Sequence, residues 1–152
     1  PAFLFAALLW GPVQRRQTAL EAEGTPPIPA LQLASQQVLS RQLQHISIPK
    51  RFSMPMRDIW DLQQRLPQRR GKRAPQTREH PRFRAAYDFL LLREAAGEIE
   101  PGLGEWWTAY QEGDEHEQRR LLEKAGGEGD PGGKTRRRRP RKRRRRSSPG
   151  NS

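Results

Sequence analysis

The stretch His80-Pro81-Arg82-Phe83-Arg84-Ala85-Ala86-Tyr87-Asp88-Phe89-Leu90-Leu91-Leu92-Arg93 decides how this chain folds. Pro81 stands where a helix can begin, because its fixed φ suits the first turn and its missing N–H costs nothing there. Gly97 is a natural residue at which to end the helix. The apolar residues between them recur at helical spacing and predict one buried face; they are Phe83, Ala86, Tyr87, Leu90 and Leu91.

Helical spacing also dominates the sequence before this stretch, and no convincing alternating strand pattern is present. The apolar run Phe3–Trp10 predicts a buried helix that is interrupted at Gly11-Pro12 and continues over 13–23 as a more polar helix. Residues 24–29 contain three prolines and predict a turn or linker. A further helix is expected over about 30–44, with an inner side marked by Leu31, Val38, Leu39 and Gln42 or Leu43.

Ser53 is expected to cap the next helix, with Pro55 in its first turn. A dense basic loop over 67–74 should end it, and a last helix should span about 103–124, with Gly113 as a point where it can break. The buried side of the helix after Ser53 is marked by Met56, Ile59, Trp60 and Leu66.

These elements predict an all-α fold. We expect a helical body of about five or six helices over residues 1–125, followed by a Gly-rich linker and a disordered arginine-rich tail over residues 126–152. The tail cannot bury enough apolar surface to order itself, and the repulsion between its charges keeps it extended.

The charge of the chain is unevenly distributed. The net charge of +12 comes from 29 Lys and Arg against 17 Asp and Glu, and residues 134–152 hold 11 of the bases and no acid. Residues 50–84 carry 11 bases and 3 acids, whereas residues 85–133 carry 4 bases and 12 acids. Two basic blocks therefore flank an acidic one. The absence of Cys excludes disulfides, thiolate zinc sites and a cysteine nucleophile.

Both basic blocks are candidate contacts for polyanions, and phosphate backbones are the usual partners of such runs. Guanidinium groups bind phosphates in a bidentate way and also stack on bases. The alternative for the central block is a solvated face, and for the tail a solubilising or targeting run. The candidate RNA-binding residues of the central block are Lys50, Arg51, Arg57, Arg65, Arg69, Arg70, Lys72, Arg73 and Arg78. Those of the tail are Arg136, Arg137, Arg138, Arg139, Arg141, Lys142, Arg143, Arg144, Arg145 and Arg146.

The aromatic pair Trp106-Trp107, with Tyr110, has two interpretations. Such rings stack bases in single-strand binders. However, adjacent helical residues point about 100° apart, so we expect one tryptophan in the core and one at its edge. Core packing is the favoured interpretation.

Catalytic candidates are poor, and no catalytic residue is assigned. The histidines are His45, His80 and His116, and the acidic residues beside His116 are better explained as a solvated face than as metal ligands. The sequence has no phosphate-cradling glycine motif and no Gly-Ser dipeptide. We predict no metal site and no cofactor in this chain.

The apolar opening run has no basic region before it and no small-residue cleavage site, so it does not look like a secretory signal. It is also far shorter than the roughly 20 residues that span a bilayer. A helix that packs inside a larger protein fits better, and we expect the chain to be the C-terminal part of a longer one.

Several landmarks, taken in order, resemble the C-terminal half of bacterial poly(A) polymerases, which are relatives of the tRNA CCA-adding enzymes. The most specific landmark is His80–Arg93, and the arginine-rich end completes the series. The others are Pro1–Trp10, Ile48–Phe52, Met56–Trp60 and the pair Trp106-Trp107.

The resemblance implies a nucleotidyltransferase that adds AMP from ATP to RNA 3′ ends in the cytoplasm. The family's catalytic head uses a Gly-Ser pair and paired aspartates to hold ATP and Mg²⁺, and nothing here matches those motifs. The resemblance therefore implies an RNA-holding body, inactive alone, whose partners are single-stranded RNA 3′ ends and, by analogy, proteins of RNA decay. The alternatives are a non-enzymatic basic nucleic-acid-binding protein and part of a CCA-adding enzyme.

Overall fold

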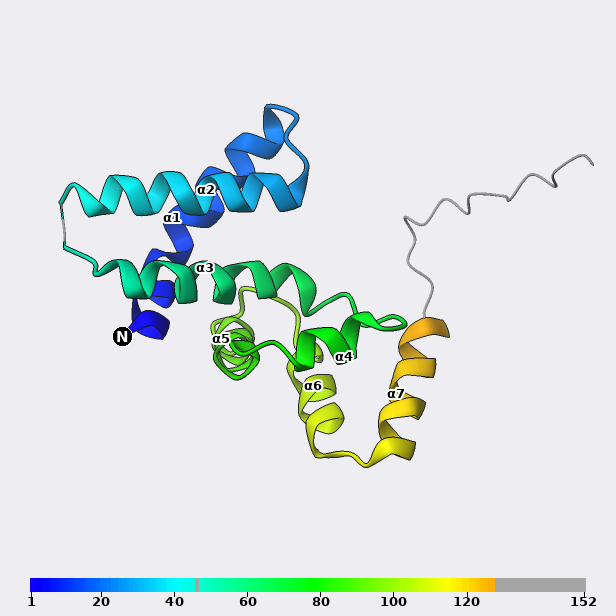
Figure 1. The fold of residues 1–152 in the computed structure, drawn as a ribbon. Coiled ribbons are helices and arrows are strands. Elements are labelled where there is room, and N and C mark those ends of the chain that lie inside the picture. The colour runs from blue at the N-terminus through cyan, green and yellow to red at the C-terminus, as the bar shows by residue number, and fades with distance from the viewer. Residues whose placement is uncertain (46, 128–152) are drawn as a thin grey trace, which may run out of the picture.

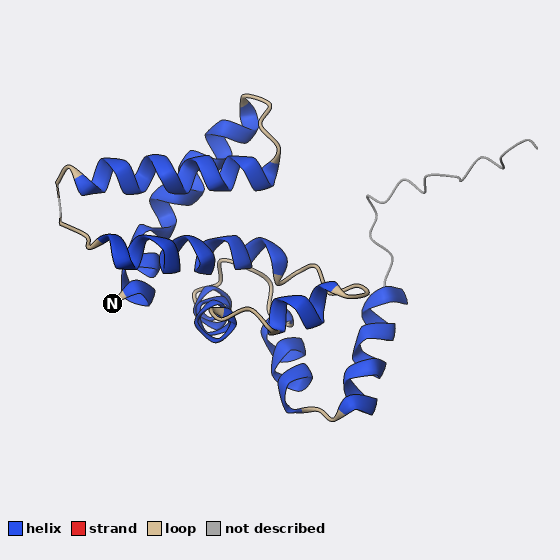
Figure 2. Cartoon of the chain, in the orientation of Figure 1, coloured by secondary structure: helices blue, strands red, loops and turns tan. Residues whose placement is uncertain are grey.

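The computed structural model describes residues 1–45 and 47–127. Within those ranges every regular element is a helix, which confirms the all-α prediction (Figure 2). The predicted tail lies outside the described residues. The helices are α1 (Ala2–Ala22), α2 (Pro27–Leu43), α3 (Lys50–Arg65), α4 (Arg73–Arg78), α5 (Phe83–Ala95), α6 (Leu103–Glu112) and α7 (Glu115–Gly127).

The helices α1, α2 and α3 form one packed unit, and α1 crosses α2 obliquely (Figure 1). The apolar residues between them form a first core, to which α1 contributes Ala6, Trp10 and Val13. Trp60 of α3 is fully buried there, and its Nε1 donates to the carbonyl of Ala6 at 3.0 Å. This hydrogen bond joins α3 to α1 through two residues that are 54 positions apart in the sequence.

A second core lies around the C-terminal end of α3, where α4, α5 and α6 meet it. Trp107 of α6 is fully buried and contacts the ring of Phe83 at a centroid distance of 5.2 Å. The helix α5 joins the two cores, because Phe89 packs in the first and Leu90 in the second. The stretch that carries the strongest sequence signal is thus the element that links both halves of the molecule.

The predicted buried face of α5 is confirmed at four positions and wrong at one. Leu91 is 36% exposed, while Phe89, which was not assigned to this face, is 4% exposed. The reason is that α5 packs on two sides, against α1 and α3 through Phe89 and against α6 through Leu90, so a single stripe does not describe it. Gly97 follows the helix with a φ of +71°, as predicted.

The predicted break of the first helix at Gly11-Pro12 is wrong, because α1 runs through it without interruption. A proline inside a helix costs about 3 kcal/mol or more. Trp10 and Val13 are buried on either side of it. Burying side chains of this size offsets that cost, at about 1.5–3 kcal/mol each.

Two other helices begin earlier than predicted. The helix α2 starts at Pro27, so the prolines assigned to a linker form its first turn, where their fixed φ suits the helix. The helix α3 starts at Lys50, and Ser53 is therefore not its cap. The extra turn of α3 places Phe52 against Phe5 of α1, with ring centroids 6.2 Å apart.

The last predicted helix is broken at Gly113 into α6 and α7, at the expected point. The buried sides predicted for α2 and α3 are confirmed at Leu31, Leu39, Met56 and Ile59. Among the residues that the structure describes, no helix combines the length and apolar character needed to cross a membrane.

Glu98 joins the loop after α5 to α1. Its Oε1 accepts hydrogen bonds from Trp10 Nε1 at 2.9 Å and Gln14 Nε2 at 2.6 Å, and Arg93 Nε lies 3.0 Å from it. Burial is the largest single influence on the pKa of Glu98, and it raises that pKa. The hydrogen bond from Trp10 and the charge and hydrogen bond of Arg93 outweigh it together, so the pKa of Glu98 lies below its ordinary value of 4.5.

The first prediction concerns acid stability. Because the folded-state pKa of Glu98 is depressed, its stabilising effect is fully present above the unfolded-state pKa and is lost as the pH falls through the folded-state pKa. We expect Glu98→Gln to lower the free energy of unfolding by about 1 kcal/mol at neutral pH, and the difference from wild type to vanish at acid pH. Urea unfolding over a pH series measures this. Glu123→Gln, at an exposed position on α7, is the matched control; equal pH profiles for both variants would contradict it.

Candidate nucleic-acid interface

The structure separates the central candidate residues into two groups. Lys50 and Arg51 lie at the start of α3, and Arg65 lies at its end, about 22 Å away at 1.5 Å per residue. The candidate residues of the central block therefore do not form one continuous patch. We call the second group the basic cluster: Arg65, Arg69, Arg70, Lys72, Arg73 and Arg78.

The basic cluster is formed by the end of α3, a short loop and α4. The loop reverses at Gly71, whose φ of +59° is a conformation that favours glycine. Ala74 and Thr77 of α4 are buried, and Arg73 and Arg78, which flank this pair on the helix, are exposed. A shallow pocket of about 300 Å³ lies between α3 and α4, lined by Arg65, Gln68, Arg73, Gln76 and Thr77.

The helix α6 holds this loop in place. Trp107 Nε1 donates to the carbonyl of Leu66, the first residue after α3, at 3.0 Å. The guanidinium of Arg69 lies over the ring of Trp106, 5.0 Å from its centroid, and Trp106 stacks on Tyr110 at 5.1 Å. The position of the basic loop thus depends on aromatic side chains some 40 residues further along the chain.

The two tryptophans divide as predicted: Trp107 is fully buried and Trp106 lies at the edge of the core. Tyr110 is buried as well, and its burial raises the pKa of its hydroxyl, although the charge of Arg78 opposes the shift. Core packing therefore accounts for Trp107 and Tyr110. Trp106 differs because an arginine covers its ring.

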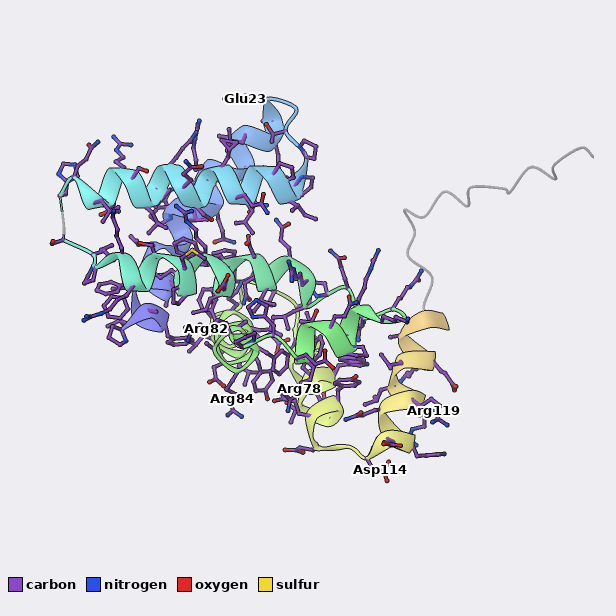
Figure 3. All side chains as sticks on the ribbon, in the orientation of Figure 1. Glu23, Arg78, Arg82, Arg84, Asp114 and Arg119 are labelled. Atoms are coloured by element: carbon purple, nitrogen blue, oxygen red, sulfur yellow. The ribbon has the colours of Figure 1, made fainter. Side chains whose placement is uncertain are left out.

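One other cluster residue, Arg78, is also oriented by an aromatic contact. The guanidinium of Arg78, labelled in Figure 3, lies 5.1 Å from the ring centroid of Phe83. The ion pairs described for residues 1–45 and 47–127 join Arg84, Arg93 and Arg120 to acids. The aromatic contacts of Arg69 and Arg78 thus hold two positive charges of the cluster in place, and such fixed positive charge attracts a polyanion.

The remaining candidates are placed differently. The guanidinium of Arg51 lies 4.9 Å from the ring of Phe52, far from the basic cluster. The Nε of Arg57 is buried and has no hydrogen-bond partner. Arg57 borders a pocket between α2 and α3 with Asp61, whose pKa is raised by burial and lowered in part by Arg65. Arg57 is thus only partly available to a ligand. The candidate residues 136–146 lie outside the described residues.

The structure also brings together three basic residues that the sequence analysis did not select. Arg15, Arg16 and Arg41 line one groove between α1 and α2. They are the only Lys or Arg among residues 1–49. Their positions on the predicted helices could have indicated a basic site only if it had been known that α1 and α2 pack side by side.

The ranges 1–45 and 47–127 contain no group of three or more His, Asp or Glu residues that could hold a metal ion. His116 and its acidic neighbours lie at the start of α7. The geometry of the basic cluster supports binding of a negatively charged ligand.

Comparison with known proteins identifies a family. Residues 23–146 match the model of the family described as "Polymerase A arginine-rich C-terminus". The chain is 41% identical over 126 residues to poly(A) polymerase I of Salmonella typhi and to that of Escherichia coli O157:H7, which covers 80% of this chain and 27% of each relative. It is 37% identical over 129 residues to poly(A) polymerase I of Haemophilus influenzae, covering 82% of this chain and 28% of the relative. The chain thus spans little more than a quarter of the length of these relatives.

Proposed function

Because this chain belongs to the polymerase A arginine-rich C-terminus family, we propose that it holds single-stranded RNA for a poly(A) polymerase that adds AMP from ATP to RNA 3′ ends. The basic cluster and the arginine-rich tail are the contacts. The AMP-transfer chemistry belongs to residues outside this chain, and we assign no catalytic step to it.

The observation that carries the proposal is the basic cluster itself. The guanidinium groups of Arg69 and Arg78 are held over the rings of Trp106 and Phe83. Arginine in such a position can bind a phosphate and also stack on a base. Phosphate contacts position a strand without reading its sequence, so the expected RNA preference is low.

The tail would act as a second contact on the same chain. It carries 11 Lys and Arg between residues 134 and 146 and no acid. Two weak sites on one chain raise the overall affinity, because binding at one site raises the effective concentration of RNA at the other. The affinity should then fall steeply with salt, with a log–log slope of about −0.7 for each phosphate contact on a single strand.

The second prediction tests both contacts. Residues 1–133 should still bind labelled single-stranded RNA, with lower affinity and a shallower salt slope than the full chain. In this shortened chain, Arg69→Ala, Arg70→Ala, Lys72→Ala and Arg73→Ala together should remove most of the remaining binding, because they delete four of the six cluster cations. Fluorescence anisotropy at several salt concentrations measures both effects.

A matched control removes four bases that the structure places outside the cluster: Arg84, Arg119, Arg120 and Lys124. It changes the net charge equally but should retain most of the binding. If the shortened chain does not bind RNA at all, the body is a packing scaffold and the role given to the basic cluster is wrong. If both quadruple variants lose binding equally, only net charge matters, and the cluster is not a site.

A further inference from the structure

The crossing of α1 and α2 leaves a groove whose rim is basic. The two helices diverge from their crossing point (Figure 1), and the groove between them has a volume of about 610 Å³. This is within the usual size range of small-molecule sites, about 300–1,000 Å³. Its lining consists of Pro12, Arg15, Arg16, Ala19, Gln37, Val38, Arg41 and Gln42.

The lining follows from helical periodicity. From α1, Pro12, Arg15, Arg16 and Ala19 recur at spacings of three and four residues, and they therefore share one face. From α2, the same spacing relates Gln37 to Arg41 and Val38 to Gln42. Apolar atoms of Pro12, Ala19 and Val38 border the groove, and the guanidinium groups come from both helices.

The charges in the groove are not balanced by acids. No Asp or Glu lines it, and none of the ion pairs found within 1–45 and 47–127 includes its arginines. The two acids of this helix pair, Glu21 and Glu23, lie at the end of α1, and Glu23 is seen at the turn that leads to α2 (Figure 3). The Nε2 of Gln17 donates a hydrogen bond to the carboxylate of Glu21, which is therefore already engaged within α1.

The arginines are partly pre-positioned. The Nε of Arg16 donates to Gln37 Oε1 across the groove. The side chain of Arg15 extends back along α1 toward Gly11. Its Nη1 lies 3.5 Å from the position that a Cβ atom on Gly11 would occupy. Arg15 and Arg41 are exposed. Holding a guanidinium in place before binding lowers the entropy that binding would otherwise cost.

We infer that the α1–α2 groove is a binding site for phosphodiester groups of single-stranded RNA, in which Arg15 and Arg41 contact phosphates and Arg16 is held by Gln37. This inference rests on the proposed RNA-holding function and adds to it a contact on a different pair of helices from the basic cluster. Three guanidinium groups from two helices favour a multiply charged chain of phosphates. The apolar atoms of Pro12, Ala19 and Val38 that border the groove suit the sugar or base of a nucleotide, and an acidic peptide would not need them.

The test uses the full chain. Arg15→Gln with Arg41→Gln removes two exposed charges, retains good helix formers and leaves the Arg16–Gln37 bond intact. We expect RNA affinity at low salt to fall several-fold, and the log–log salt slope to become shallower by about 1.4 for two lost contacts. The matched control is Arg119→Gln with Lys124→Gln on α7, which lies away from the α1–α2 pair (Figure 3) and loses the same charge. Equal binding of the two variants would overturn the inference.

Further arms separate the possible causes. Circular dichroism melting of each variant verifies that it is folded. If ATP binding depends on Arg15 and Arg41 whereas RNA binding does not, the phosphates come from a free nucleotide and the RNA site is wrong. A different result would leave the proposed function intact: wild type binds RNA, and the quadruple cluster variant binds RNA more weakly. If the groove variant then binds as well as its control, only the groove inference fails. If wild type does not bind RNA, the proposed function fails with it.

Discussion

Replacing Trp107 with alanine is expected to lower the free energy of unfolding by about 3–5 kcal/mol, the usual cost of deleting a buried large aromatic side chain. Trp107 is fully buried, packs on Phe83 and donates its Nε1 to Leu66. The substitution opens a cavity in the second core and leaves the carbonyl of Leu66 without this partner. Thermal and urea unfolding measure the loss.

Two variants show which part of Trp107 matters. Trp107→Phe keeps most of the ring but loses the bond to Leu66, so it should cost about 1–3 kcal/mol. Trp106→Ala, at the neighbouring position, removes a ring at the edge of the core and should cost less than Trp107→Ala. Trp106→Ala should nevertheless weaken RNA binding, since Arg69 loses the ring that positions it. Equal stability of the two alanine variants would contradict this account of the second core.

Replacing Trp60 with alanine is expected to have an effect of similar size, about 3–5 kcal/mol, but in the first core. Trp60 is fully buried and binds the carbonyl of Ala6. Its loss should release the N-terminal half of α1 from α3, because this bond and the ring's contacts join the two helices. Hydrogen exchange of α1 amides, measured with unfolding, tests this directly.

The control is Trp60→Phe, which keeps apolar contact and removes the donor. It should raise exchange in α1 by less than the alanine variant does. If the amides of α1 remain as protected in Trp60→Ala as in wild type, the contacts of α1 with α2, α5 and Glu98 are sufficient to hold it, and the assigned role of Trp60 is wrong. Comparison with Trp107→Ala would then show whether the two cores unfold together or separately.

Of the alternatives left open by the sequence, the comparisons favour one. The matching family is defined by poly(A) polymerase C-termini, and the relatives are named as poly(A) polymerases. A CCA-adding enzyme and an unrelated basic nucleic-acid-binding protein are both less consistent with that match.

Much of the fold could be predicted from the sequence, because helix periodicity is a local property. The spacing of Met56, Ile59 and Trp60 identified a buried face without reference to any partner, and Gly97 and Gly113 marked helix ends. The helix start at Pro27 was missed because a run of prolines is typical of a linker, whereas Pro27 stands in the first turn of α2, where its fixed φ suits the helix. The start at Lys50 was missed because Ser53 and Pro55 have the pattern of a cap and a first turn, whereas α3 runs through Pro55.

The sequence by itself determined the all-helical class, the basic composition and the resemblance to poly(A) polymerases, since each depends on residue type and order alone. The tertiary structure decided which charges stand together. It separated Lys50 from Arg65 by the length of α3, placed Arg69 on Trp106, and brought Arg15 and Arg41 into one groove. These arrangements depend on which faces of distant helices pack, and a local pattern holds no information about the partner of a face.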